Sequence, residues 1–289
     1  MKRRPSVDQT RLPSSSSITK PEQVLVLDLI EKGDIIRPYS DTFREVSDRI
    51  GQRYTYSAPQ TRDELAAVLL DVRPTVVILD AHGAYDARKD VLSLRIGDRQ
   101  INVDDLLPHG LIPPIWILSA CDASVTGAIR GCFVRKLLGQ GAICVIASLS
   151  KIDAFTASMF VGRFLTHIYS PVRPDLSDTL DIVFFNAQYT TALLYDPLLP
   201  LIRRAETDPS LRKPLGSVMS DFMQWVGVRE LDVRRHKYEI ATFLAEALER
   251  YGLTQLQEQY EKAGFIRPET LLFTAFGAPG HVQLSQPAR

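Results

Sequence analysis

Two short segments of the sequence contain the side chains best suited to catalysis. Asp80-Ala81-His82-Gly83 follows a short apolar run, and Ser119-Ala120-Cys121-Asp122 ends another run of similar length. Ligands of an open parallel sheet bind beyond the carboxyl ends of its strands. If the two runs are neighbouring strands, His82 and Cys121 lie on one edge of the sheet, within reach of each other. A thiol beside an imidazole is a nucleophile with its base, and cysteine needs only modest activation near neutral pH.

The backbone beside these side chains fits the same chemistry. Gly83 has no side chain, so a substrate can approach its backbone closely. We expect the N–H groups of Gly83 and Cys121 to face the oxyanion that forms during attack on a carbonyl. The alternative is that His82 and Cys121 are packing residues, the more common role of either type alone at a strand end. Their occurrence as a pair favours catalysis, whereas Cys132, expected on a helix, and Cys144, expected inside a strand, are interpreted as packing residues.

The pair depends on an alternation of strand and helix patterns that begins at residue 24. Strand patterns cover 24–30, 53–57, 75–79, 115–120 and 142–149, and helix patterns cover 42–50, 61–70, 127–138 and 154–168. The helix at 61–70 opens with the capping-box residues Thr61 and Glu64. A β-hairpin is expected around Gly97-Asp98. Strands that alternate with helices require crossover connections, so we predict an α/β fold with a mostly parallel sheet covered by helices on both faces.

Helical patterns dominate from about Pro174 to Ala263, and a last strand pattern follows at 271–276. Because that run is apolar enough to pair in the main sheet, we expect 174–263 to be an insertion docked on one flank of the sheet. Apolar residues recur within it at helical spacing, most clearly Ile240, Phe243, Leu244, Ala247 and Leu248. Residues 1–22 are polar and rich in Ser, which predicts a disordered arm, and 23–289 are expected to form one domain.

Composition excludes several classes of protein. Lys plus Arg and Asp plus Glu each number 34, and this zero net charge disfavours a protein built to bind nucleic acid. No apolar run reaches the ~18–20 residues of a membrane span, and no secretory signal is evident, so we expect a cytoplasmic protein. The three cysteines form no pattern of a disulfide framework or zinc site. Neither the glycine motifs of nucleotide-binding loops nor a Gly-x-Ser-x-Gly elbow occurs.

Residues 24–170 resemble the caspase-like cysteine peptidases, most closely the CHAT group, which is related to separases and caspases. The family has His-Gly after one strand, then a hairpin, then Ser-Ala-Cys and an acidic residue at the next strand end. Here His82-Gly83 and Ser119-Ala120-Cys121-Asp122 hold those places. The family then has a Gly-Ala turn, a strand end Ser-Leu-Trp and a nearby Asp, and it often has Phe-Gly-Asp-Pro near its C-terminus. The corresponding residues are Gly141-Ala142, Ser148-Leu149-Ser150, Asp153 and Phe276-Gly277-Ala278-Pro279.

Three departures from the family pattern bear on the substrate cleft. Ser150 stands where Trp is usual, Ala278 where Asp is usual, and Ala123-Ser124 where Thr-Gly is common. None of them removes His82 or Cys121. Because of these three departures, the resemblance does not determine the shape of the substrate cleft.

The resemblance implies a caspase-like three-layer sandwich with a mostly parallel central sheet, helices on both faces and a C-terminal helical insertion. It implies peptide hydrolysis through a thioester on Cys121, with His82 as the acid and base, Gly83 and Cys121 N–H groups as the oxyanion hole, and no cofactor or metal. It also implies a substrate pocket formed by Asp28 or Asp34, Ser119, and residues Ser148 to Asp153. An inward-facing Asp28 or Asp153 would favour a basic substrate residue, and the alternative is that both acids are solvated loop residues.

Two functions of different classes, an enzyme and a binding protein, fit these observations. The first is a cysteine endopeptidase that cleaves a specific protein partner and is activated by a partner or effector, since CHAT modules often accompany sensing modules, some of them in bacterial defence including antiviral defence. The second is a catalytically silent caspase-like scaffold that binds a protein. Retention of both His82 and Cys121 favours the first. Neither involves nucleic acid or a membrane.

Overall fold

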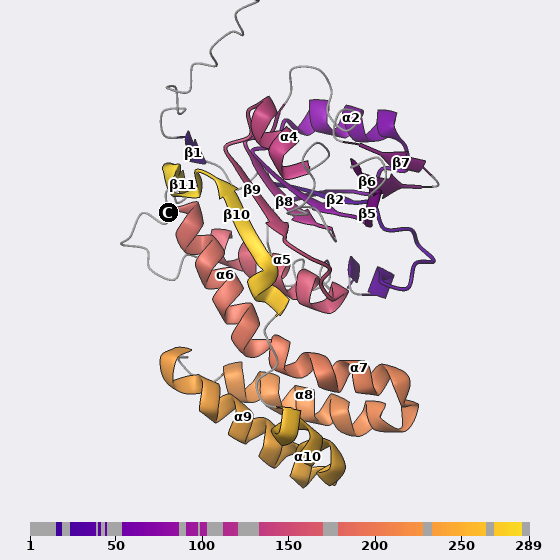
Figure 1. Cartoon of the computed structure of the whole chain (residues 1–289), viewed down its shortest axis with the longest axis vertical. Coiled ribbons are helices and arrows are strands. Elements are labelled where there is room, and N and C mark those ends of the chain that lie inside the picture. Colours follow the sequence, from indigo (N-terminus) through magenta and orange to yellow (C-terminus); the bar gives the residue numbers. More distant parts are fainter. Residues whose placement is uncertain are drawn as a thin grey trace, which may run out of the picture.

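The computed structural model of the chain describes residues 16–18, 24–38, 40–41, 44, 54–86, 91–97, 99–102, 112–120, 133–169, 179–227, 233–263 and 269–284. Its centre is a six-stranded sheet of order β10-β9-β8-β4-β2-β3 (Figure 1). The strands are β2 (Val24–Asp28), β3 (Thr55–Ser57), β4 (Val76–Asp80), β8 (Ile115–Ser119), β9 (Cys144–Ser148) and β10 (Phe273–Gly277). All are parallel except β10, which runs antiparallel to β9. The predicted α/β fold with a mostly parallel sheet is confirmed.

The winding of the sheet reverses between β2 and β4. Strand β3 lies on one side of β2, and β4 lies on the other. The connections that leave the carboxyl ends of β2 and β4 therefore diverge, and a crevice opens between them where α/β proteins bind ligands. His82 lies two residues beyond the end of β4, at this crevice.

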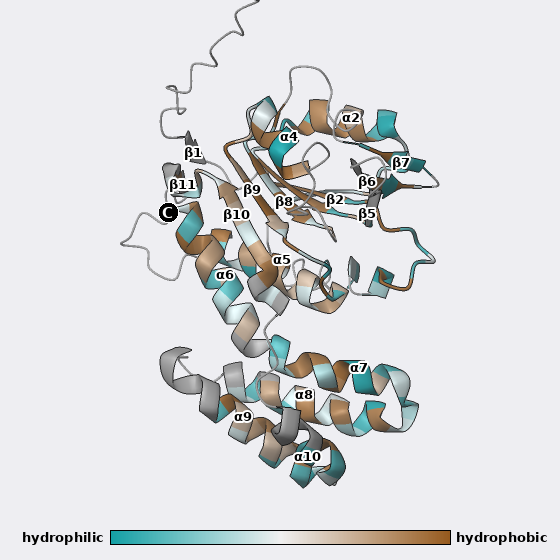
Figure 2. Cartoon of the chain, viewed as in Figure 1, coloured by the Kyte–Doolittle hydropathy of each residue, from teal (hydrophilic) through white to brown (hydrophobic). Residues whose placement is uncertain are grey.

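Alternate residues of each strand pack on opposite faces of the sheet. The flanking helices are α2 (Arg62–Val72), α4 (Phe133–Gln140), α5 (Ala154–Tyr169) and α6 (Leu180–Leu194). Leu79 packs in the core covered by α2 and α4, and its neighbour Ile78 packs in the core covered by α5 and α6. Figure 2 shows the resulting layers, with apolar strands between helices that carry hydrophilic residues on their outer sides. Within the described residues, no helix is long and apolar enough to span a bilayer.

The capping box predicted at the start of α2 is present. The Thr61 hydroxyl accepts the N–H of Glu64 at 3.2 Å, and the Glu64 carboxylate accepts the N–H of Gln60 at 2.7 Å. The first bond satisfies an N–H group that the first helical turn leaves without a partner, and the second holds the residue before the N-cap against the helix. The helix therefore begins where the sequence predicts it.

The return of the chain to the sheet through β10 is also confirmed. Gly277 ends this strand with a φ of +94°, and a Cβ there would lie 2.2 Å from the carbonyl oxygen of Ile143. Only glycine fits this position, both for its backbone conformation and for its distance from β9. At the other end of the strand, the Phe273 ring stacks on Phe160 of α5 with centroids 4.1 Å apart.

Two smaller sheets accompany the main one. The predicted hairpin is formed by β6 (Val91–Ile96) and β7 (Arg99–Ile101), and β5 (Gly83–Asp86) adds a third antiparallel strand. The expectation of a disordered arm over 1–22 is wrong for Ser16–Ile18, which form strand β1 and pair with β11 (Val282–Leu284). A strand whose partner is more than 260 residues away carries no local signal in the sequence.

Four further helices form a separate layer, called here the helical lobe, below the sheet in Figure 1. They are α7 (Leu199–Thr207), α8 (Arg212–Gly227), α9 (Val233–Arg250) and α10 (Thr254–Ala263). The predicted apolar set from Ile240 to Leu248 packs with Leu215, Val218 and Phe222 of α8 in a third core, not against the sheet. An apolar helical face indicates burial but does not identify its partner. The whole segment 174–263 was expected to dock on the sheet, but within its described part it is α6 that does so, beside α5.

A buried carboxylate joins the helical lobe to the sheet. Asp196, in the short 3₁₀ helix η2 (Asp196–Leu198) that precedes α7, accepts the N–H of Thr270 at 3.1 Å and its hydroxyl at 2.8 Å. The hydroxyl of Thr156 on α5 lies 3.4 Å from the same carboxylate. Because Thr270 lies just before β10, one side chain ties together the entry to the lobe, the exit from it, and α5.

We predict that Asp196→Ala lowers the free energy of unfolding by about 1–3 kcal/mol, because the substitution leaves the buried Thr270 N–H and hydroxyl unsatisfied. Urea unfolding followed by circular dichroism measures the change. Asp71→Ala, at an exposed position of α2, is the control and should change stability by no more than about 0.5 kcal/mol. Equal stabilities of the two variants would contradict the role given to Asp196.

Candidate active site

The residues predicted for the site share one edge of the sheet. Asp28 is in register with Asp80, and Asp80 with Ser119, across β2, β4 and β8. Ser148 is next in the same row, because the residues before Ser119 and Ser148 are paired. The Ala81 N–H donates to the Ser119 carbonyl at 3.2 Å, so β4 and β8 remain joined to their ends.

His82 lies just beyond this edge, and its imidazole contacts a carboxylate. Its Nε2 lies 2.7 Å from Oδ2 of Asp34, and the His82 side chain is 38% exposed. The other Asp34 oxygen accepts the Ile36 N–H at 3.0 Å. Burial alone would raise the pKa of Asp34, but the bonds from Ile36 and His82 outweigh it and lower that pKa. The structure thus presents a half-exposed imidazole that is held by an ionised carboxylate.

The loop that carries Asp34 is anchored at its base by Asp28. The Asp28 carboxylate, almost fully buried, lies 2.9 Å from the Arg37 guanidinium and accepts the Tyr56 hydroxyl and the Ile30 N–H. Arg37 also donates to the Ile30 carbonyl at 2.8 Å. The charge of Asp28 is therefore balanced within the protein, and its contacts fix both ends of the segment that positions Asp34.

Asp80 lies beside this ion pair, and both of its carboxylate oxygens accept hydroxyl groups. Ser40 donates to one of its oxygens at 2.6 Å and Ser119 to the other at 3.0 Å. Burial raises the pKa of Asp80 to about 6, and the neighbouring charge of Asp28 adds to the rise against the effect of the hydroxyls. The Ser119 side chain, predicted to bind substrate, donates to this carboxylate.

The remaining predicted residues are the last residue of β9, Ser148, and those of the connection between β9 and α5. Ser148 is fully buried, and its hydroxyl exchanges hydrogen bonds with the backbone of Ser150. Asp153 accepts the Phe155 N–H at 2.9 Å at the start of α5, and its second oxygen lies 3.2 Å from the Arg203 guanidinium of α7. Asp153 thus connects the site edge to the helical lobe.

Of the three cysteines, Cys144 lies within the described part of the chain. It is fully buried in β9, and burial raises the pKa of its thiol to about 12, so its thiolate is negligible near neutral pH. This agrees with its predicted packing role. Cys121, Asp122, Ala123-Ser124 and Cys132 lie outside the described residues, and Ala120, buried at the end of β8, is the last described residue before Cys121.

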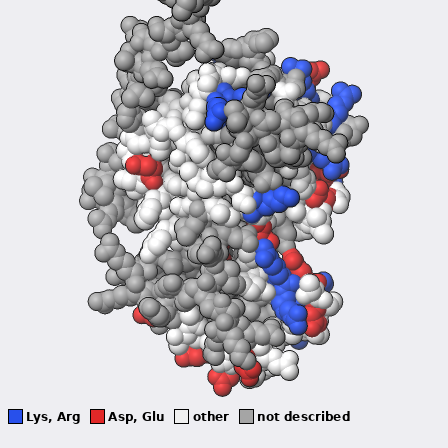
Figure 3. Space-filling view, viewed as in Figure 1, with Lys and Arg blue, Asp and Glu red and all other residues white. Residues whose placement is uncertain are grey.

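A cleft of about 650 Å³ lies beside this edge. Its walls come from the loop after β2, the loop after β9, and α7; the lining residues are Ile35, Ile36, Lys151, Ile152, Asp153, Ala154, Arg203 and Glu206. Figure 3 shows charges of both signs side by side where the sheet meets the helical lobe. Within the described residues, no group of His, Cys, Asp or Glu is arranged to hold a metal ion.

Sequence reasoning missed two contributions to this region. Asp34 was considered only as a pocket residue, since nothing in the sequence indicates that it contacts a histidine 48 positions away. Arg203 and Glu206 carried no signal, because they belong to a helical segment without a recognisable counterpart. Both contributions depend on the tertiary fold.

The model of the CHAT domain matches residues 15–177, which is more than half of the chain. The chain belongs to the CHAT domain family. The match covers β1 to α5, and therefore His82, Asp34 and the whole row of strand-end residues. The comparison with curated proteins found no match.

Two solved structures are similar to this CHAT protein. One is the Arg-specific cysteine proteinase gingipain R, at 14% identity and a TM-score of 0.41, covering 60% of this chain and 42% of gingipain R. The other is the complex of the pro- and mature domains of RgpB from Porphyromonas gingivalis, at 13% identity and a TM-score of 0.39, covering 59% of this chain and 43% of that one. The chain thus aligns with less than half the length of either structure.

We predict that Asp80 makes stability fall as pH rises. Its pKa is raised from 3.8 to about 6 on folding, so the folded state holds the proton more tightly and loses stability between about pH 4 and 6. Asp80→Asn removes this dependence, so the variant should gain stability relative to wild type across that range. Urea unfolding at pH 4, 5, 6 and 7 tests this, with Asp71→Asn as the control, and a difference that is constant with pH would show the reasoning to be wrong.

Proposed function

We propose that this CHAT protein is a cysteine endopeptidase that cleaves a specific protein partner. The observation that carries the proposal is the register of β4 and β8, which aligns Asp80 with Ser119. His82 and Cys121 each lie two residues beyond that aligned pair in the sequence. The proposal therefore assigns nucleophile and base to the ends of the adjacent strands β8 and β4, and β4 borders the point where the winding of the sheet reverses.

In the proposed reaction, the Cys121 thiol gives its proton to His82 and the thiolate attacks the scissile carbonyl. The N–H groups of Gly83 and Cys121 stabilise the resulting oxyanion. Collapse of this intermediate breaks the C–N bond, and the leaving amine takes the proton from His82. Water, deprotonated by His82, then hydrolyses the thioester and releases the acid and the free thiol.

Asp34 acts in this proposal as a positioning residue. With its carboxylate on Nε2 of His82, the other ring nitrogen is left to exchange the proton with Cys121. The carboxylate also stabilises the imidazolium that forms in the first step. Its own position is fixed by the Ile36 N–H and by the Asp28–Arg37 ion pair at the base of the loop.

We propose that the substrate lies along the cleft between the loops after β2 and β9. Asp153 lines this cleft, the buried Ser119 and Ser148 support it from the strand ends, and Asp28 supports it through Arg37. Because both acids already have arginine partners, the earlier reason to expect a basic substrate residue is weakened. We also propose that residues 23–289 form one peptidase domain with 174–263 as an insertion before the last strand, and that a partner protein activates it, as in a bacterial defence system.

We predict that a peptidyl probe with a thiol-reactive group labels Cys121, and that Cys121→Ala and His82→Ala each abolish labelling at this site and hydrolysis. Cys144→Ala should retain both, because its thiol is buried and protonated. Mass spectrometry of the labelled protein and of peptide products measures both effects. A folded wild-type protein that neither reacts at Cys121 nor cleaves peptides, alone or with candidate partners, would favour the silent scaffold.

We predict that Asp34→Asn lowers kcat about 100-fold with little change in KM, because a misplaced imidazole costs rate rather than binding. The assay uses a peptide that the wild type cleaves. Glu31→Gln, on the same loop and paired with exposed Arg95, is the matched control and should be close to wild type. Partial recovery of kcat in Asp34→Glu would support a positioning role, whereas a wild-type kcat in Asp34→Asn would exclude it.

A further inference from the structure

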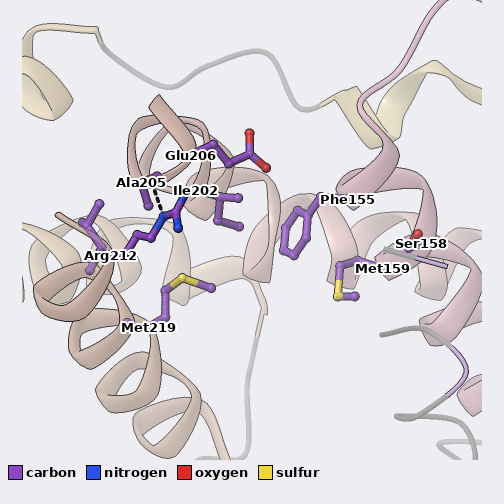
Figure 4. A pocket seen from close by; sticks show the side chains of 10 residues that line it. Phe155, Ser158, Met159, Ile202, Ala205, Glu206, Arg212 and Met219 are labelled. Carbon is purple, nitrogen blue, oxygen red and sulfur yellow. Dashed lines mark hydrogen bonds between the residues drawn. The ribbon is translucent and has the colours of Figure 1, made fainter. Parts of the chain in front are cut away.

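A second hollow lies between the sheet and the helical lobe. It has a volume of about 390 Å³ and lies between α5, α7 and α8 (Figure 4). Its lining residues are Phe155, Ser158, Met159, Ile202, Ala205, Glu206, Arg212, Leu215, Gly216 and Met219. The site described above uses none of these side chains as catalytic groups.

The chemistry of this pocket is apolar and adaptable. Phe155, Met159, Ile202, Leu215 and Met219 supply most of its walls, and two of the four methionines in the chain are among them. Methionine is flexible and polarisable, so it adapts to apolar groups of different shapes. Arg212 and Glu206 are the exposed charged residues of the lining. The Arg212 guanidinium donates to the Ala205 carbonyl at 3.2 Å, which fixes its place between α7 and α8.

The pocket continues from the cleft beside the catalytic edge. Glu206 of α7 lines both hollows. At the start of α5, Ala154 lines the cleft and the next residue, Phe155, lines the pocket. The cleft in turn includes Ile35, which is 89% exposed. Ile35 is next in sequence to Asp34, and Asp34 contacts His82. The cleft and the apolar pocket are therefore adjacent, and the loop that positions Asp34 beside His82 forms one wall of the cleft.

We propose that this pocket binds a large apolar side chain of the polypeptide substrate, several residues away from the bond that is cleaved. This inference rests on the proposed peptidase function and adds a class of substrate to it. An extended polypeptide presents alternate side chains to opposite sides, so a chain bound along the cleft can direct one side chain over Glu206 into the pocket. The helical lobe, which supplies α7 and α8, would thereby determine specificity at a position distant from the dyad.

Gly216 is a position from which a larger side chain can fill the pocket. A Cβ at this position of α8 meets no atom within 4 Å, and the residue has no positive φ. Gly216→Trp therefore places a large apolar side chain at the pocket. Gly139→Trp is the matched control, because a Cβ at Gly139 of α4 is equally unobstructed, and α4 covers the opposite face of the sheet.

The experiment uses peptides from a tryptic digest of a cell lysate, with cleavage products identified by mass spectrometry. We expect wild-type products to be enriched in Phe, Tyr, Trp, Leu or Met at one fixed position distant from the cleaved bond. Gly216→Trp should lower kcat/KM about tenfold for such peptides relative to peptides with Ser at that position. Gly139→Trp should leave the ratio at the wild-type value. Met219→Ala, which enlarges the pocket, should also alter the preference for apolar side chains. If thermal unfolding shows Gly216→Trp to be destabilised, Met219→Ala is used in its place.

A second measurement separates this inference from the proposed function. The Cys121→Ala protein is incubated with the same peptides, and bound peptides are identified by mass spectrometry. Enrichment of apolar peptides that is lost in Cys121→Ala/Gly216→Trp supports the pocket whether or not hydrolysis occurs. Hydrolysis by the wild type with no distant apolar preference, or with one unchanged by Gly216→Trp, overturns the pocket and leaves the peptidase proposal standing. Absence of both hydrolysis and peptide binding, for the protein alone and with candidate activating partners, overturns both.

Discussion

The edge of the sheet that presents His82 depends on one buried ion pair, between Asp28 and Arg37. A carboxylate so deeply buried is tolerated only with its partner in place, because an unpaired charge there costs several kcal/mol. Asp28 is fixed by the sheet, and Arg37 is carried by the loop after β2, so their pairing determines the path of that loop. Asp34 lies on the loop between them, and through it the orientation of His82 depends on charges that do not touch the imidazole.

The same edge is bounded on its other side by the helical lobe. Asp196 fixes the entry and exit of the lobe with hydrogen bonds to Thr270, and Arg203 of α7 reaches Asp153 at the start of α5. One of these contacts is buried and satisfied, while the other is partly exposed and correspondingly weak. The buried contact at the base of the lobe therefore contributes more to stability than the partly exposed ion pair beside the cleft.

The parts of the fold that could be predicted are those with local causes. Thr61 and Glu64 identify the start of α2 because a capping box involves four consecutive residues, and the apolar run before Gly277 identifies a strand of the main sheet. The His82–Asp34 contact and the β1–β11 pair could not be predicted, since each joins segments far apart along the chain. The stripe from Ile240 to Leu248 was correctly expected to be buried but was given the wrong partner. The spacing of apolar residues indicates that one face of a helix is apolar. Which element packs on that face depends on the tertiary fold.

The pairing of β1 with β11 gives the protein a mechanical property. The two strands run parallel with Ser16 opposite Val282 and Ile18 opposite Leu284. Tension applied to the chain before β1 and after β11 would pull the strands along their length in opposite directions. All the hydrogen bonds between them would then bear load together instead of opening one after another. The β1–β11 pair would therefore carry such a force before it reached β10 or the strand ends beside His82.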